Sequence, residues 1–282
     1  MLLGAHMSVA GGLSAAFERA QSIGINTMQV FTKNQNRWQQ KPATPADIAA
    51  WFAAQEATGI RPVVSHAAYL LNLATPDDVL WQKSVNALAD ELTRAEQLAI
   101  LGVVFHPGAH MNSGEEAGIA RIIAGLDQTH AATSGYNALT VLETTAGQGT
   151  ALGYRFEQLE AVLAGVREPE RIGFCFDTCH VFAAGYDIRT PETYAAAIAE
   201  FDRLLGLDRL KCFHLNDSKK GLGSRVDRHD HIGAGLLGLA PFGFILKDPR
   251  FAVMPLILET PKSEDLHEDV ENLAILRGLV EK

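Results

Sequence analysis

Short, nearly continuous apolar runs alternate along this chain with longer segments in which apolar residues recur at helical spacing. Strands that are buried on both faces of a parallel sheet have this continuous pattern, whereas half-exposed antiparallel strands alternate cleanly. The pattern therefore predicts eight parallel strands. They span residues 2–8, 26–32, 61–66, 102–106, 138–143, 172–177, 210–215 and 254–259.

Capping residues predict where the intervening helices begin and end. A hydroxyl side chain followed by proline is typical of a helix start, and so is a serine followed three residues later by glutamate. Glycine is typical of the position just after a helix. The predicted starts are Thr44-Pro45, Thr75-Pro76, Ser113, Thr190-Pro191 and Ser263, and the predicted ends are Gly59, Gly102 and Gly206.

Eight strand–helix units in 282 residues predict an α/β fold of the (β/α)8 TIM-barrel type. The right-handed crossover rule leaves an open, doubly wound sheet as the alternative. The first predicted strand is not followed by a G-x-G-x-x-G loop, which weakens that alternative. Because no linker or low-complexity segment interrupts the chain, residues 1–282 are expected to form one domain.

Candidate metal ligands stand at the ends of six predicted strands, at intervals of 34 to 45 residues. In a barrel, these strand ends would meet on one rim, the C-terminal one. Three further candidates lie in the loops that follow two of these strands. The nine candidates are His66, His106, Glu143, Asp177, His180, His214, Asp227, His229 and Glu259.

This set of five imidazoles and four carboxylates suits zinc, and suits manganese or iron less well. A catalytic zinc takes about three protein ligands, so the set would hold about three ions with one carboxylate shared. Taken singly, a histidine at a strand end is more often a hydrogen-bonded rim residue, and a carboxylate there often caps the next helix. Six strands ending in this way favour a metal cluster at the C-terminal rim.

The remaining histidines divide into two groups. His6, His110 and His231 are expected to line the same region as outer residues or substrate contacts. His130 and His267 lie on helical stretches and are expected to face solvent.

Composition narrows the class of protein only modestly. Hydrophobic residues make up 47% of the chain, which provides a sizeable core, and the net charge of −9 argues mildly against a nucleic-acid partner. Bound dications would offset that charge locally. Three cysteines without disulfide spacing favour a reducing compartment, and Cys175 is expected to be buried. With no signal peptide and no membrane span, a cytoplasmic monomer is expected.

Longer motifs connect the candidate ligands over the whole chain. They are GAHMSVAGG (4–12), FTKNQ (31–35), SHAAYLLNL (65–73), FHPGAH (105–110), LETTAGQG (142–149), GFCFDTCH (173–180), HLNDSKKGLGSRVDRHDHIGAG (214–235) and LILETP (256–261). At these residues the sequence resembles the endonuclease IV family, the zinc-dependent apurinic/apyrimidinic endonucleases of base-excision repair. The resemblance implies a TIM barrel with three Zn²⁺ ions on its rim, with Mn²⁺ an alternative at some sites.

The resemblance also implies how the ligands divide among the ions. The first zinc would be held by His66, His106 and Glu143. Glu143 would bridge to the second zinc, which would be completed by Asp177, His214 and Glu259. The third zinc would be held by His180, Asp227 and His229.

The implied reaction is hydrolysis of the phosphodiester bond 5′ to an abasic site in double-stranded DNA. A hydroxide that bridges the first two zinc ions would be the nucleophile, because metal-bound water has a pKa of about 7. Glu143 and Glu259 would position the metals and handle the proton. The products would be a 3′-hydroxyl and a 5′-deoxyribose phosphate, and 3′-blocking groups would be removed by the same chemistry.

DNA contacts are expected from the rim loops. The positions that match the family's groove-inserting loops are Asn34, Gln35, Asn36, Arg37, Trp38, Tyr69 and Leu70. Asn36 stands where the family form has arginine and Arg37 follows, so either residue is a candidate to fill the gap left by the flipped nucleotide. Expected phosphate contacts, each with a solvated surface charge as the alternative, are Lys33, Lys219, Lys220, Arg225, Arg228 and Lys262.

Two other classes of function remain as alternatives. A metal-dependent sugar isomerase or epimerase on a related barrel would also place His, Asp and Glu at strand ends, normally with fewer metals. A non-catalytic nucleic-acid-binding barrel would use the metals structurally. The DTCH and DRH segments, which supply the third ligand group, favour the nuclease.

Overall fold

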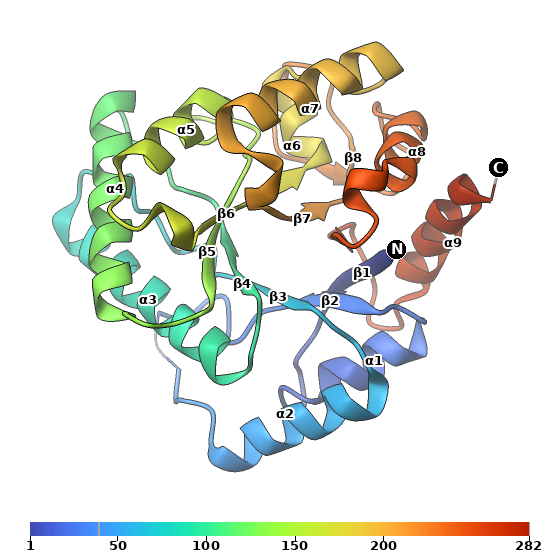
Figure 1. Cartoon of the computed structure of the whole chain (residues 1–282), viewed down its shortest axis with the longest axis horizontal. Coiled ribbons are helices and arrows are strands. Elements are labelled where there is room, and N and C mark those ends of the chain that lie inside the picture. Colours follow the sequence, from blue (N-terminus) through green and yellow to red (C-terminus); the bar gives the residue numbers. More distant parts are fainter. Residues whose placement is uncertain (39, 282) are drawn as a thin grey trace.

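The eight predicted strands form a closed parallel barrel in the computed structural model, which describes residues 1–38 and 40–281 (Figure 1). Around the barrel the order is β1-β10-β7-β6-β5-β4-β3-β2, so neighbours in the sheet are neighbours in the chain. The fold is therefore the predicted (β/α)8 barrel. Its strands are β1 (Leu2–Met7), β2 (Thr27–Val30), β3 (Val63–His66), β4 (Gly102–Phe105), β5 (Leu139–Glu143), β6 (Ile172–Asp177), β7 (Leu210–His214) and β10 (Pro255–Leu258).

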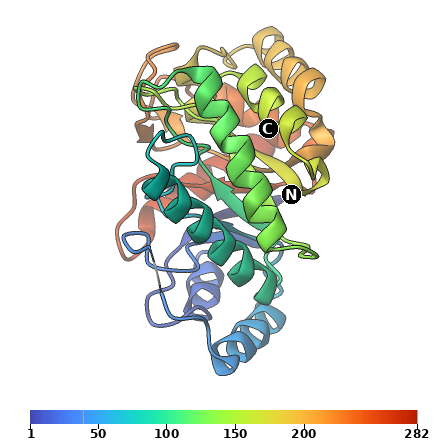
Figure 2. The ribbon, with the colours of Figure 1, turned by 90° about the vertical axis from the view of Figure 1, so that its left-hand side faces the viewer.

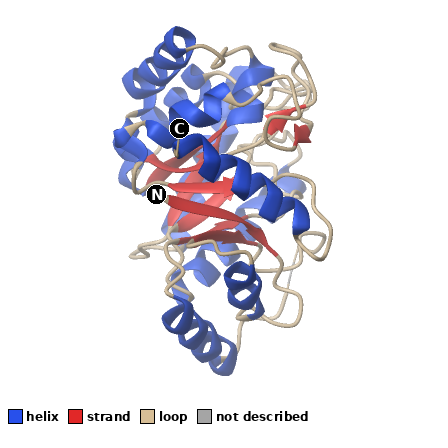
Figure 3. Ribbon diagram, turned by 90° about the vertical axis from the view of Figure 1, so that its right-hand side faces the viewer, coloured by secondary structure: helices blue, strands red, loops and turns tan. Residues whose placement is uncertain are grey.

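Helices cover the outside of this barrel, and the strands lie inside them (Figures 1 and 3). The helices α3 and α4 pack side by side across one face (Figure 2). The short antiparallel pair β8 (Asp217–Ser218) and β9 (His229–Asp230) lies among the long loops after β7. The helices are α1 (Ala15–Ser22), α2 (Pro45–Thr58), α3 (Asp78–Gln97), α4 (Glu115–Ala132), α5 (Phe156–Gly165), α6 (Thr178–Ala184), α7 (Pro191–Leu205), α8 (Ala240–Lys247) and α9 (His267–Val280). Within the described residues, none of the helices has the length and apolar character needed to cross a membrane.

Two predicted helix starts are confirmed in detail. The side chains of Thr44 and Thr190 each accept a hydrogen bond from the backbone three residues on, and proline occupies the first helical position. The predicted ends at Gly59 and Gly206 are also confirmed as capping positions.

Four other predicted boundaries are wrong, three of them because a turn precedes the helix. Asp77, not Thr75, caps α3, and Gly114, at φ of 100°, precedes α4 instead of Ser113. Ser263 lies ahead of α9, which begins at His267. Gly102 does not end a helix but begins β4, where a Cβ atom would lie 2.8 Å from the Leu139 carbonyl oxygen of the adjacent strand.

The barrel interior is filled by an apolar plug of six side chains. They are Val64, Val104, Val141, Cys175, Cys212 and Ile257, all fully buried. Cys175 is buried as predicted. Each plug residue lies two positions before a candidate ligand, and side chains two apart on a strand point to the same face. The plug therefore forms the layer directly beneath the candidate ligands.

The expectation that His130 faces solvent is wrong, because its side chain is buried between α4 and the barrel. Its Nε2 lies 2.9 Å from the Thr140 hydroxyl oxygen, and that hydroxyl donates to the Arg171 carbonyl. The Thr140 oxygen therefore accepts a hydrogen from His130 Nε2, and His130 Nδ1 has no partner among the described residues. Burial, together with the Arg171 charge, lowers the pKa of His130 from its ordinary 6.5 to about 4. His267 is exposed, as predicted.

This burial predicts an acid-sensitive contribution to stability. Between pH 6.5 and 4 the unfolded chain binds a proton at His130 that the folded chain does not, so the free energy of unfolding falls as the pH falls. His130→Gln, whose amide can still donate to Thr140, should reduce the loss between pH 7.5 and pH 5 by about 2 kcal/mol. Denaturant unfolding at both pH values measures this difference, and an equal loss in both proteins would contradict the assignment.

Candidate metal centre

All nine candidate ligands converge above the apolar plug. Several groups of His, Cys, Asp and Glu in the described residues have ligand atoms within 4.8 Å of one another; three of these groups consist of the candidates alone, and others include Cys175, Cys179 or Cys212. The three groups of candidates have the same membership as those expected from the sequence. They are His66, His106 and Glu143; Glu143, Asp177, His214 and Glu259; and His180, Asp227 and His229.

Glu143 joins the first two groups because its two carboxylate oxygens face different sides. Oε2 lies 3.1 Å from His66 Nε2 and 3.2 Å from His106 Nε2. Oε1 lies 2.9 Å from His214 Nδ1. The carboxylate is fully buried at the end of β5. This is the arrangement required of a ligand shared between two cations.

The second group gathers three carboxylates around one imidazole. His214 Nδ1 lies 2.9 Å from Glu143, 3.2 Å from Glu259 Oε2 and 3.8 Å from Asp177 Oδ2. Glu143 and Asp177 are fully buried, whereas the Glu259 side chain is 17% exposed. Glu259 is therefore the carboxylate of this group that a molecule arriving from solvent can reach.

The third group comes from α6 and the loop after β7. His180 Nε2 and His229 Nε2 lie 3.3 Å apart, and both face Asp227 Oδ1, at 3.2 and 3.5 Å. His180 Nδ1 lies 2.9 Å from the Thr144 carbonyl oxygen and donates to it, so in the neutral imidazole that a metal requires Nε2 is the nitrogen with the lone pair. Two nitrogens and one carboxylate oxygen that converge in this way form a donor set suited to zinc.

Electrostatics support the same interpretation for the paired groups. Burial opposes protonation of His214, yet the carboxylates of Glu259 and Glu143 raise its pKa to about 10. Burial likewise opposes ionisation of Glu143, but the imidazoles of His214 and His106 hold its pKa well below its usual value. A proton on the His214 imidazole thus offsets part of the charge of these ionised carboxylates when no cation is bound. A dication uses the same donors and would displace that proton.

Two residues that the sequence analysis did not identify hold the ligands in place. Gln29 of β2 accepts from His214 Nε2 at 2.8 Å and donates to Glu259 Oε1 at 2.5 Å. Asn216 donates to Asp177 Oδ2 at 2.7 Å and accepts from the Glu259 backbone at 3.0 Å. Both are fully buried. The sequence feature that could have identified Gln29 is its position as a polar residue inside the predicted strand 26–32.

The three outer histidines have different surroundings. His6 lies beside the centre, with Nδ1 3.8 Å from Glu259 Oε1 and 3.0 Å from Gln29 Nε2. His110 accepts instead from the Gly114 backbone ahead of α4. His231 contacts Asn272 of α9. The contacts of His110 and His231 therefore differ from the expected role at the centre.

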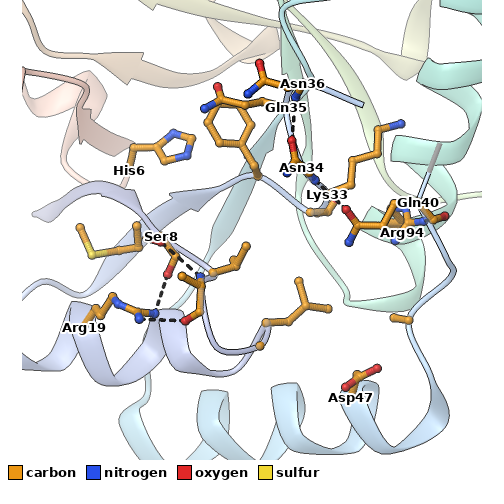
Figure 4. Close-up of a pocket in the computed structure, with 18 of the residues that line it drawn as sticks. His6, Ser8, Arg19, Lys33, Asn34, Gln35, Asn36, Gln40, Asp47 and Arg94 are labelled. Carbon is orange, nitrogen blue, oxygen red and sulfur yellow. Dashed lines mark hydrogen bonds between the residues drawn. The ribbon is translucent and has the colours of Figure 1, made fainter. Parts of the chain in front are cut away.

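A cavity of about 1290 Å³ opens beside the centre and is lined in part by His229, Glu259, Tyr69 and residues 31–36 (Figure 4). Tyr69 is 70% exposed, and its ring centroid lies 5.9 Å from that of His66. The expected DNA-facing positions Asn34, Asn36 and Arg37 are exposed, and Gln35, Trp38 and Leu70 are partly buried. These residues lie in the loops after β2 and β3, on the rim that carries the metal ligands.

The basic side chains that were expected to contact DNA phosphates differ in whether they are exposed and unpaired enough to do so. Lys219, Lys220, Arg225 and Arg228 are exposed on the loop after β7. Lys33 differs from the expectation, because its side chain is 1% exposed and its Nζ is paired with carboxylates. It cannot contact a phosphate in this position.

Lys262 is less available than expected, because its Nζ lies 2.6 Å from Asp269 and donates to the His6 carbonyl. Arg225 is also engaged, since its guanidinium stacks 4.1 Å from the centroid of the Tyr154 ring and donates to the Gly147 carbonyl. The interaction with Gly147 and Tyr154 holds the segment that carries Asp227 against the loop after β5.

Comparisons with known proteins agree with this geometry. The sequence model of a family described as xylose isomerase-like TIM barrel matches residues 17–277. "Probable endonuclease 4" of Chloroflexus aurantiacus is 55% identical over 278 residues, which covers 99% of this chain and 98% of that protein. "Probable endonuclease 4" of Geobacter sulfurreducens is 51% identical over 99% of this chain and 95% of that protein.

Solved structures are similar over the same length. The crystal structure of endonuclease IV from Thermus thermophilus has a TM-score of 0.89 and 37% identity, covering 100% of this chain and 99% of that one. A D-tagatose 3-epimerase-like protein has a TM-score of 0.76 at 18% identity, covering 100% and 97%. At that identity the second likeness shows a shared fold alone.

Proposed function

Because this chain belongs to the endonuclease IV family, we propose that it is a DNA-repair endonuclease that hydrolyses the phosphodiester bond 5′ to abasic sites in duplex DNA. The products would be a 3′-hydroxyl and a 5′-deoxyribose phosphate. The same cleavage at the 3′ oxygen of a damaged end would remove 3′-blocking groups.

One observation carries this proposal, the sharing of Glu143 between two donor groups with a third group beside them. We infer three Zn²⁺ ions, held by the three groups as they stand. When bound there, zinc would polarise the phosphate oxygens and lower the pKa of a coordinated water. An epimerase on a related barrel does not explain the third group of His180, Asp227 and His229.

The chain's own residues supply position and proton transfer. Hydrogen bonds from Gln29 and Asn216 fix the carboxylates of Glu259 and Asp177. Glu259 is the partly exposed carboxylate of its group, and the neighbouring His214 holds its pKa well below its usual value although burial opposes this. An ionised carboxylate at this place can accept the proton of the attacking water. The oxygen of that water forms the new bond to phosphorus, the bond between phosphorus and the 3′ oxygen breaks, and the 3′ oxygen takes up a proton from solvent to become the 3′-hydroxyl.

Substrate selection falls to the rim loops. Tyr69 is 70% exposed, and it stands beside His66 at the mouth of the centre. Extrusion of an abasic sugar requires less free energy than that of a paired base, which favours the damaged site. Residues 34–38 and Leu70 are proposed to occupy the space that the extruded nucleotide leaves.

The test is incubation of the purified protein with a duplex that carries one abasic analogue, without added magnesium. We expect incision on the 5′ side of the analogue that survives brief EDTA treatment, and about three zinc ions per chain by metal analysis. One or two manganese ions with turnover of a ketose would support the epimerase. An intact duplex after incubation with fully zinc-loaded protein would overturn the proposal.

A further inference from the structure

A network of buried charges connects helix α3 to the loop after β2. Lys33 Nζ lies 3.1 Å from Asp90 Oδ2 and 3.5 Å from Glu91 Oε1, and the side chains of Lys33 and Glu91 are each 1% exposed. The adjacent Thr32 hydroxyl donates to Glu91 Oε2 at 2.5 Å. The start of the loop is therefore attached to α3 through two successive side chains.

The far side of the same loop is attached to the same helix by Arg94. Its Nη2 donates to the carbonyl oxygens of Gln40 and Lys41, at 2.8 and 3.1 Å. Its Nε donates to Asp90 Oδ2 at 3.1 Å, the oxygen that also binds Lys33. Asp90, Glu91 and Arg94, here called the α3 anchor, thus hold both ends of the segment.

Between these ends, residues 34–38 form a turn, here called the tip, of which Figure 4 shows Asn34, Gln35 and Asn36. The Asn34 backbone N–H donates to Gln40 Oε1 at 2.8 Å, and Asn34 Oδ1 accepts from the Asn36 backbone at 2.9 Å. The Arg37 backbone donates to the Asn34 carbonyl. The side chains of Asn34, Asn36 and Arg37 remain exposed, and Asn34 and Asn36 line the cavity.

The network is balanced in charge and has little tolerance for loss of a member. Two cations and two carboxylates face one another, and Lys33, Glu91 and Arg94 are almost fully buried. Removing one member of such a network leaves an opposite charge buried without its partner. These contacts connect α3 to a single loop. In the described part of the chain, the tip of this loop makes no hydrogen bond to the nine candidate ligands. Such an arrangement fixes a binding loop before its ligand arrives, which reduces the conformational entropy lost on binding.

We propose that the α3 anchor presets the tip for DNA that carries an abasic site, so that Asp90, Glu91 and Arg94 are positioning residues for substrate binding. This inference rests on the proposed function. It assigns to the anchor an effect on the KM for the abasic duplex, with the hydrolytic step unchanged. Loss of a network that serves only to stabilise the barrel would not raise KM selectively while leaving the hydrolytic step unchanged.

The test compares Arg94→Gln with a matched control, Arg171→Gln. Arg171 is also almost fully buried. Its guanidinium donates to the His130 carbonyl oxygen and to the Thr133 hydroxyl oxygen. These two partners lie at the end of α4 and just after it, far along the chain from the tip. We expect Arg94→Gln to raise the KM for an abasic duplex about tenfold, because two or three charged hydrogen bonds are lost, with kcat within about twofold of the wild type. Arg171→Gln should leave KM unchanged. Arg94→Lys should recover part of the loss, since an ammonium reaches fewer of the acceptors than a guanidinium.

A second readout does not depend on activity. Arg37 provides a trypsin site within the tip, whereas the next lysine, Lys41, precedes proline and resists cleavage. Arg94→Gln should accelerate cleavage after Arg37 about tenfold, and Arg171→Gln should not. If Arg94→Gln does not fold, Asp90→Asn takes its place in both experiments, with the same expected results. The Asp90 side chain is 38% exposed, so this substitution disturbs the buried part of the network less.

The outcomes separate the two proposals. Unchanged KM and unchanged cleavage in the folded anchor variant, or equal changes in the Arg171 control, would overturn the role of the anchor. A wild-type protein that does not incise the duplex would count against the proposed function, and the trypsin comparison would still decide whether α3 holds the tip.

Discussion

Glu259→Gln should leave the barrel folded and reduce incision of an abasic duplex by about 10³-fold. The substitution keeps the size of the side chain, and the new amide oxygen can still accept from Gln29, which now donates to Glu259 at 2.5 Å. It removes the negative charge beside His214 and the partly exposed carboxylate that would accept a proton. Rates under single-turnover conditions and circular dichroism of the same samples measure both expectations.

A matched variant distinguishes this effect from a general loss of glutamate charge. Glu271 lies exposed on α9, and Glu271→Gln should incise at the wild-type rate. Zinc analysis of Glu259→Gln adds a further distinction. Loss of one ion would identify Glu259 as a metal ligand, whereas full zinc occupancy would identify it as the proton acceptor. Undiminished turnover in Glu259→Gln would mean that the paired groups are not the reactive centre.

Prolonged dialysis against a strong chelator should abolish incision and lower the melting temperature by about 10 °C. The reason is the concentration of charge above the apolar plug, where Glu143 and Asp177 are fully buried and face each other around His214. Ions that bind the folded centre and not the unfolded chain stabilise the fold by about 4 kcal/mol at a thousandfold excess over their Kd. Activity assays and thermal unfolding, before and after zinc is restored, measure both effects.

The comparison before and after dialysis also defines a result that would contradict the metal centre. The eight-stranded barrel and its plug are built from apolar contacts, so the circular dichroism spectrum below the melting transition should not change on dialysis. A protein that incises abasic DNA at full rate after metal analysis shows it to be free of zinc would contradict a metal centre at these residues.

The strands and the meeting of six ligands on one rim were predictable because both follow from the geometry of parallel strands, whereas the division of the ligands into three groups rested on the resemblance. A strand whose residues are all buried reads as one apolar run, and the last residue of each run marks the same rim. Six such ends therefore placed Glu143 and Glu259 together although 116 positions separate them in the chain. His180, which lies on α6, and Asp227 were candidates from their positions after two strands, but their grouping with each other required the longer motifs, since loop conformation does not follow from spacing.

The errors arose where a property depends on packing between elements. Lys33 lies in a motif of DNA-facing residues, but only the position of α3 shows that its charge is buried against Asp90 and Glu91. His130 has a polar side chain on a helix, and its burial depends on how α4 meets β5. Gln29 interrupts an apolar run, and its role became clear only when His214 and Glu259 were seen on either side of it.

The apolar plug has a consequence for the route by which ions enter and leave. Because six packed side chains fill the barrel beneath the ligands, the centre communicates with solvent through the rim in the part of the chain that the structure describes. DNA bound across that rim would cover the only exit of the ions from the described part of the structure. Under the proposed function, DNA and zinc would therefore share one route to solvent, and an enzyme bound to damaged DNA would be protected against the loss of its ions.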